Sequence, residues 1–175
     1  MTMDLVRARV DARWWIWGLP LSFAVHDGEE AVAIVLDGGL DQGGTRFTVA
    51  QSLTAILAEF AVVWALTLFA DRALRAGHTG RTGPGGWALD AYAALLGGWT
   101  LHGLHHVYLG LSGSGYPLGV ITALPAVVLY GALTYAALLR AGLLDRRRTV
   151  LSLVAGAPAA VLLIAAALTF GRLTS

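Results

Sequence analysis

Two short runs of the sequence combine histidine and glutamate at spacings that suit metal coordination. The run 26–30 reads His-Asp-Gly-Glu-Glu, and the run 102–106 reads His-Gly-Leu-His-His. In each run, residues of ligand type stand at positions i, i+3 and i+4, which share one face of an α-helix. Imidazole and carboxylate ligands together suit iron, zinc or manganese. The spacing therefore predicts a metal site assembled from two helices.

A further acidic residue, Glu59, stands alone in the apolar run 57–63. Three ionised glutamates beside neutral imidazoles would leave about three uncompensated negative charges in a low dielectric, which is prohibitive unless cations or protons neutralise them. No lysine or arginine occurs at this depth of the predicted helices. One or two divalent ions, with iron or zinc first, are therefore the expected cofactors. The candidate metal ligands are His26, Glu29, Glu30, Glu59, His102, His105 and His106.

Two other interpretations of these residues stay open. The cluster also suits a site that handles protons or ions, and it suits a polar structural core in which a glutamate remains protonated. Six ionisable residues on aligned helix faces favour metal binding over packing alone. Asp27 is expected to accept a hydrogen bond from one of the metal ligands. Asp90 is expected to reach water near a helix end, and His78 is expected to be solvated in a loop.

The composition indicates that the helices that carry these residues lie in a membrane. The chain is 57% hydrophobic and only 13% charged, with a mean hydropathy of +0.67, whereas a soluble domain carries about 25% charged residues. A net charge of +1 gives no argument for nucleic-acid binding. The absence of cysteine excludes disulfides, iron–sulfur clusters and thiolate zinc sites. No cleavable signal peptide is evident, because acidic residues and His26 interrupt the first apolar stretch.

The predicted fold class is all-α, a polytopic membrane bundle of about five transmembrane helices in a single domain, residues 1–175. Each apolar stretch reaches the length of roughly 20 residues that crosses a bilayer. The predicted spans are 14–36, 47–74, 87–111, 119–139 and 150–170. The segments 37–44, 77–86 and 111–117 are rich in glycine and other turn residues and are expected to be loops.

Arginines predict how the bundle is oriented. They gather before the first span, between the second and third, and between the fourth and fifth, while the other two loops hold only Arg46. By the positive-inside rule the N-terminus is inside and the C-terminus outside. The expected location is the inner (cytoplasmic) membrane, as a multi-pass protein, and the frequent alanine, glycine and arginine favour a bacterial source. Tryptophans at 14, 15, 17 and 87 then lie at the cytoplasmic interface.

Prolines and glycines are expected to shape the bundle. Pro20 removes a backbone donor shortly before His26 and is expected to kink the first helix, while Pro125 and Pro158 are expected to bend the fourth and fifth. The Gly97-Gly98 pair permits close approach of another helix. Counting about 1.5 Å per residue from the cytoplasmic ends places all the polar runs in one cluster, in the middle-to-outer half of the membrane.

Several segments taken together resemble a known family. The runs 23–30, 105–109 and 116–123, with the isolated Glu59, resemble the bacterial membrane family named for its His-x-x-Glu-Glu motif. The resemblance covers most of the first four predicted spans. It implies a shared polar cluster but supplies no substrate, since the family has no settled activity. Leu118 stands between Pro117 and Gly119 where the family pattern has Pro-Gly adjacent, so this turn is expected to differ.

The preferred function is a membrane metalloenzyme that acts on a hydrophobic or lipid-soluble small molecule. A pair of irons would suit oxidation by dioxygen, and His-x-x-His-His resembles a motif of membrane fatty-acid hydroxylases and desaturases, although this chain lacks their other histidine boxes. A zinc site would instead serve a hydrolase, an isomerase or a cyclase. A metal or proton transporter is the competing class, and a structural subunit the third. The expected partners are the lipid bilayer and the substrate, with no nucleic acid, and a homo-oligomer is compatible with the sequence.

Overall fold

The structure is a computed structural model that describes residues 3–76, 86–113 and 118–174, and it is mostly helical. The predicted all-α class is confirmed. Two helices, α1 (Met3–Leu36) and α2 (Val49–Arg75), are followed by α3 (Gly86–Leu111). A continuous helix over Val120–Arg140 then comprises α4 (Val120–Thr122), the π-helix η1 (Ala123–Leu129) and α5 (Tyr130–Arg140), and α6 (Arg146–Thr174) follows.

A β-hairpin joins α1 to α2 where the sequence predicted only a loop. Strands β1 (Leu40–Gln42) and β2 (Thr45–Phe47) pair antiparallel, with Leu40 opposite Phe47. Gly43 and Gly44 form the turn with φ angles of +55° and +76°, which a two-residue hairpin turn of the primed type requires. Phe47, predicted as the first residue of the second span, therefore belongs to β2. Helix α2 begins only after Thr48, whose side chain forms a capping box with Gln51.

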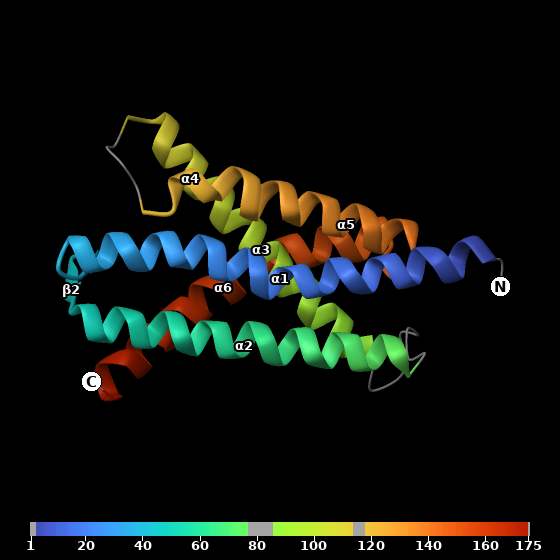
Figure 1. Ribbon diagram of the computed structural model, residues 1–175, viewed down its shortest axis with the longest axis horizontal. Coiled ribbons are helices and arrows are strands. Elements are labelled where there is room, and N and C mark those ends of the chain that lie inside the picture. Colours follow the sequence, from blue (N-terminus) through green and yellow to red (C-terminus); the bar gives the residue numbers. More distant parts are fainter. Residues whose placement is uncertain (1–2, 77–85, 114–117, 175) are drawn as a thin grey trace.

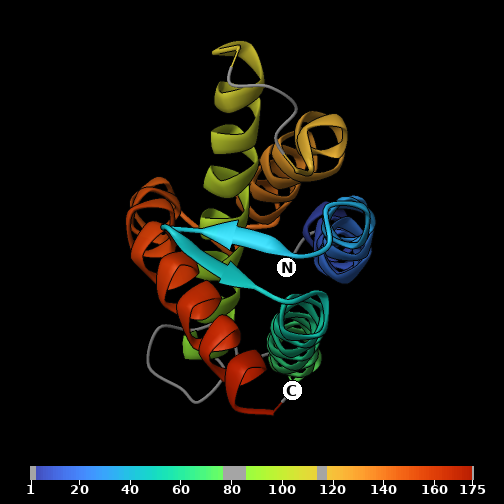
Figure 2. The ribbon, with the colours of Figure 1, turned by 90° about the vertical axis from the view of Figure 1, so that its left-hand side faces the viewer.

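The helices form a bundle with α1 and α2 antiparallel and side by side (Figure 1). The helix α4–η1–α5 runs along the other flank of α1, and α3 passes behind them at a steep tilt, packed mainly against α6 (Figures 1 and 2). The two termini lie at opposite ends of the long axis. Helix α1 begins at Met3, well before the predicted span, and its early residues Ala12 and Ile16 are buried in the core.

Glycines bring α3 and α6 into backbone contact. A Cβ added to Gly98 would lie 2.5 Å from the carbonyl oxygen of Gly156, and one added to Gly97 would lie 2.5 Å from that of Ser152. No larger side chain fits at such a distance, so small residues allow the two helices to pack. The close approach predicted from the Gly97-Gly98 pair is thus confirmed, and α6 is the partner.

Pro20 lies inside α1 without ending the helix. Because proline has no N–H, the carbonyl of Ile16 loses its usual helical donor. The hydroxyl of Tyr92, which is fully buried on α3, donates to the Ile16 oxygen at 3.1 Å and replaces that bond. The neighbouring Tyr130 hydroxyl donates to the Trp15 carbonyl at 2.6 Å. Side chains from α3 and α5 therefore hold α1 about three turns before the polar run.

The outer surface of the bundle is apolar. Within the described residues, three helices are long and apolar enough to cross a membrane: Val49–Arg75, Val120–Arg140 and Arg146–Thr174. Large apolar side chains such as Leu57, Leu133 and Leu162 are exposed on them. A soluble monomer rarely exposes such extended apolar surface, so these helices indicate a membrane protein. Helices α1 and α3, which carry the polar runs, are not among these three.

Ion pairs stabilise the end of the bundle where the N-terminus lies. The Asp71 carboxylate on α2 accepts from Arg13 of α1 at 2.8 Å and from Arg75 at 2.7 Å. Arg148 of α6 bonds Asp90 of α3 at 2.6 Å. The Asp90 side chain is 54% exposed, which confirms the expectation that it reaches water.

Candidate metal centre

Four side chains of α1 and α3 converge on one point inside the bundle. The Nε2 atoms of three histidines approach a single oxygen, Glu30 Oε1, at 3.6 Å for His26, 3.7 Å for His102 and 3.3 Å for His106. All four ligand atoms lie within 4.8 Å of one another. His26 is completely buried and the other three are largely buried. The described residues therefore contain a cluster of three imidazoles and one carboxylate.

The distances within this cluster suit a shared cation better than direct hydrogen bonds. The three contacts to Glu30 Oε1 span 3.3 to 3.7 Å, whereas an N–H···O hydrogen bond is normally about 2.7–3.2 Å. Metal–ligand bonds of about 2.0–2.2 Å in tetrahedral geometry place neighbouring ligand atoms roughly 3.4 Å apart. The three imidazole nitrogens therefore lie at about the ligand-to-ligand spacing from Glu30 Oε1, and all four atoms lie within 4.8 Å of one another.

Each helix contributes its i and i+4 residues to the cluster. His26 and Glu30 come from one turn of α1, and His102 and His106 from one turn of α3. The rings of His26 and His102 are nearly perpendicular, with centroids 5.2 Å apart. Residues at i+3 lie about 100° round the helix from those at i+4. Glu29 and His105 therefore diverge from the cluster.

A hydrogen-bond relay sets the orientation of His26. The Thr122 hydroxyl donates to Glu29 Oε2 at 2.8 Å, and its oxygen lies 2.9 Å from His26 Nδ1. With its only hydrogen directed to Glu29, the hydroxyl accepts from Nδ1–H, which assigns the proton of His26 to Nδ1. Nε2 is then a free lone pair, and it is buried with no hydrogen-bond partner in the described structure. Such a second bond to the ring is typical of metal-binding histidines.

The backbone at Gly119 closes the cluster on one side. Gly119 precedes α4 in a left-handed conformation, with φ +73°. A Cβ added there would lie 2.5 Å from His26 Cε1 and 3.0 Å from Glu30 Oε1. Only glycine supplies both the backbone angle and the space. The turn expected to differ because of Leu118 is therefore a wall of the site, while Pro117 lies outside the described residues.

An aromatic layer separates the cluster from the arginine-rich end of the bundle, the end where the N-terminus lies with Arg13, Arg75 and Arg148. Trp99, one turn before His102, stacks on that ring at 5.5 Å between centroids and meets His26 edge-on at 5.1 Å. Its indole donates to Ser22 Oγ at 2.8 Å, and Ser22 in turn donates to the Ala126 carbonyl in η1. The rings of Phe23 and Phe60 continue the layer. These side chains restrict water on this side of the site.

Comparison with known proteins agrees with the geometry. A family model described as a protein of unknown function with HXXEE motif matches residues 17–135. The chain belongs to this HXXEE family. Neither a search of curated proteins nor a search of solved structures found a match. The matched region includes all four residues of the cluster and confirms the resemblance drawn from the sequence.

The structure gives the three named positions of the HXXEE motif two different roles. The histidine, His26, and the second glutamate, Glu30, point into the cluster. The first glutamate, Glu29, accepts from the backbone N–H groups of Ile121 at 3.2 Å and Thr122 at 2.9 Å. It therefore caps the N-terminus of the fourth long helix, where the helix dipole favours negative charge. His26 and Glu30 of the motif thus belong to the cluster, while Glu29 attaches α1 to the helix that covers the cluster.

The other predicted site residues lie around the four. Glu59 of α2 is partly buried and close enough to Glu30 and His102 to interact with them electrostatically. Asp27 is buried and interacts in the same way with Glu30 and Glu59. The exposed His105 has its ring centroid 6.1 Å from that of His106. His78 is outside the described residues.

Three contributors to the site were missing from the sequence prediction: Ser22, Trp99 and Thr122. A signal for two of them was present, because Ser22 stands four residues before His26 and Trp99 three residues before His102. These spacings place them on the ligand-bearing faces of α1 and α3. Thr122 had no such signal, since its position depends on how the fourth helix packs against α1.

Proposed function

We propose that this HXXEE protein is an integral membrane metalloprotein that binds one divalent transition-metal ion through His26, Glu30, His102 and His106. The observation that carries the proposal is the convergence of three Nε2 atoms on Glu30 Oε1 at 3.3 to 3.7 Å. The sequence alone favoured one or two ions because it offered more ligands. The geometry supports one, since four of those residues meet at a single point.

The ligand set favours iron or zinc. Imidazole is a borderline donor and carboxylate a hard one, and together they suit zinc, iron or manganese, while the chain has no cysteine thiolate to select copper(I) or an iron–sulfur cluster. Four protein ligands leave two positions open around a six-coordinate iron. The side chains of Glu30 and His102 retain 18% and 22% exposure, so a small molecule can approach the cluster.

We further propose that the site is catalytic and that its substrate is a lipid-soluble small molecule. A bound iron would supply oxidation by dioxygen, whereas a zinc ion held by all four residues would have to become five-coordinate to bind and activate water. Glu59 is the carboxylate placed to exchange a proton with a substrate beside Glu30 and His102. The apolar surface of the surrounding helices favours a substrate that partitions into the bilayer.

One observation favours an enzyme over the competing transporter. A carrier requires a polar path to the site from both sides of the membrane. On the arginine-rich side, Phe23, Phe60 and Trp99 stack in contact next to the cluster. An ion would have to cross this apolar layer.

Adjacent histidines of α3 provide the decisive experiment. His106 belongs to the cluster, whereas the exposed His105 does not. Protein purified in mild detergent without chelator is expected to hold one iron or zinc ion per chain by elemental analysis. His106→Ala should lose the ion and His105→Ala should retain it. The proposal is wrong if the parent protein is metal-free and takes up no metal on reconstitution.

A further inference from the structure

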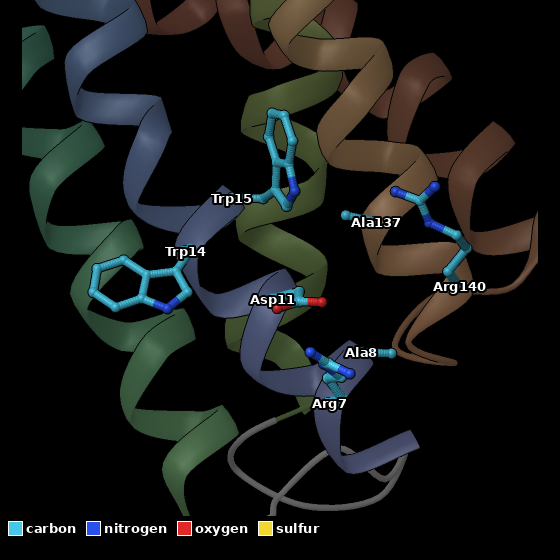
Figure 3. A pocket seen from close by; sticks show the side chains of 7 residues that line it. All are labelled: Arg7, Ala8, Asp11, Trp14, Trp15, Ala137 and Arg140. Atoms are coloured by element: carbon cyan, nitrogen blue, oxygen red, sulfur yellow. The ribbon is translucent and has the colours of Figure 1, made fainter. Parts of the chain in front are cut away.

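A groove runs along α1 from the arginine-rich end of the bundle toward the metal centre. Its outer part, about 410 Å³, lies between α1 and α5, with Arg7 and Asp11 on one wall and Arg140 on the other (Figure 3). Its inner part, about 450 Å³, is almost entirely apolar and reaches Val25 and Ala126. Trp14 and Trp15 line both parts, so the two form one continuous groove.

One face of α1 forms a whole wall of this groove. The lining residues recur every three or four positions, which keeps them on a single helix face. Along this face, in order, stand Arg7, Asp11, Trp14, Gly18, Leu21 and Val25, with Ala8, Trp15 and Ser22 beside them. Polarity changes along this face: the charged residues come first, the indoles next and the apolar residues last. An amphiphile with a polar head and a long apolar chain has the same order of groups.

The dimensions of the groove match one lipid in one leaflet. From Trp14 to Val25 the helix rises roughly 16 Å, which is close to half of a hydrocarbon core about 30 Å thick. From Arg7 to Trp14 it rises roughly 10 Å, which spans the headgroup layer of about 5–8 Å on one side of the bilayer and extends slightly beyond it. Tryptophans prefer the boundary between these layers, and Trp14 and Trp15 stand at that point.

The charges at the outer end suit a phosphate group. Arg7 and Arg140 lie on opposite walls, and neither guanidinium makes an ion pair with any residue that the structure describes. Arginine forms bidentate hydrogen bonds with phosphate oxygens. Two arginines and Asp11 leave a net positive charge, which favours an anionic headgroup. The Asp11 carboxylate can accept hydrogen bonds from hydroxyl groups on that headgroup.

We propose that this groove binds an anionic phospholipid of the adjacent leaflet. The phosphate lies between Arg7 and Arg140, and one acyl chain follows α1 past Gly18 and Leu21 toward Val25. The inference stands apart from the proposed metal chemistry, because none of the lining residues belongs to the cluster of four. The inner end of the groove, at Ser22 and Val25, lies one helical turn before His26.

Lipid retention by the full-length protein in detergent tests the proposal. Native mass spectrometry with added phosphatidylglycerol should show one tightly bound lipid, and phosphatidylcholine should bind at least about tenfold more weakly. The double variant R7Q/R140Q should lose about tenfold in phosphatidylglycerol affinity. The matched control R146Q/R147Q removes the same charge from exposed arginines at the same end but outside the groove, and should change affinity less than twofold.

A second pair of variants tests the path of the acyl chain. Leu21 and Val32 are both exposed on α1, at 67% and 62%, but only Leu21 lines the groove. Leu21→Trp should obstruct the chain and weaken binding, while Val32→Trp should not. The proposal is overturned if both double arginine variants lose the lipid equally, if the two lipids bind equally, or if Leu21→Trp retains parental affinity. Unchanged melting temperatures establish that each variant is folded.

Discussion

At the scale of single residues, Glu30 is the group on which the proposed metal site depends. All three histidines approach one carboxylate oxygen, Glu30 Oε1, whereas Glu59 lies beside the cluster. Glu30→Gln keeps the shape of the side chain but supplies a neutral amide, which is a poor ligand. Metal content should fall to less than about a tenth of the parent value. Elemental analysis of purified protein measures this directly.

Glu59→Gln is the matched control for that substitution. It also removes one buried carboxylate, yet metal content should be retained because Glu59 is outside the group of four. Activity should be lost if Glu59 exchanges a proton with the substrate. Loss of the ion in Glu59→Gln would instead show that Glu59 is a metal ligand, as the sequence predicted.

Thr122 is a positioning residue that acts through His26. Thr122→Val preserves volume but removes the oxygen that lies 2.9 Å from His26 Nδ1. The ring would lose the bond that fixes its tautomer, and metal affinity should fall by about 10–100-fold. Competition with a chromogenic chelator measures the dissociation constant. Thr169→Val, an exposed change on α6, should leave that constant unaltered.

The residues of the site were more predictable than their roles. Spacing alone placed His26, Glu30, His102 and His106 on common helix faces, because the period of the helix is a local property. Spacing could not decide between Glu29 and Glu30. That choice depends on which neighbour each face meets: Glu29 faces the start of α4 and Glu30 faces α3. Such orientation is set by packing between segments distant in the chain.

At the scale of elements, α1 depends on a donor from another helix. Tyr92→Phe would leave the Ile16 carbonyl, already without a helical donor because of Pro20, buried and unpaired. An unsatisfied buried group costs about 1–3 kcal/mol, so the melting temperature should fall by several degrees. Tyr108→Phe, at a side chain that is 67% exposed, should have little effect. Thermal denaturation followed by intrinsic fluorescence compares the two.

Most helices were predictable from apolar length, and the exceptions have local causes. The hairpin in 37–47 was missed because its strands are only three residues each, and glycine was interpreted as a loop signal. The early start of α1 was missed because arginines at 7, 9 and 13 suggested the end of a span, although a helix can continue into the headgroup layer. The π-helix at Ala123–Leu129 contains Pro125, where only a bend was predicted.

At the scale of the whole molecule, arginines define one end of the bundle. Those at positions 7, 13, 75, 140 and 148 belong to helix ends that lie together, while Arg46 and Arg172 lie at the other end near Phe47 (Figure 1). By the positive-inside rule we expect the N-terminus in the cytoplasm and the C-terminus outside. A reporter active only in the cytoplasm should be silent when fused after Ser175 and active when fused before Met1. The reverse pattern would contradict the proposed orientation.

The apolar exterior of the helices explains why the general class was predictable. Hydropathy reports the surroundings of each helix, and in a bilayer those surroundings are lipid. Which helices pack together was not predictable: the Gly97-Gly98 pair indicated that a helix approaches there, but not that the partner is α6 at Gly156.

The turn at Gly119 has a consequence for the order in which the protein matures. A ribosome completes all four ligands by residue 106, but the segment that walls the site and orients His26 spans only residues 119–122. A nascent chain that ends before residue 119 contains all four cluster residues but lacks the turn that closes one side of the cluster. Under the proposed function, we therefore expect firm retention of an ion only after the fourth long helix has been synthesised and docked, and an ion that binds earlier should remain exchangeable.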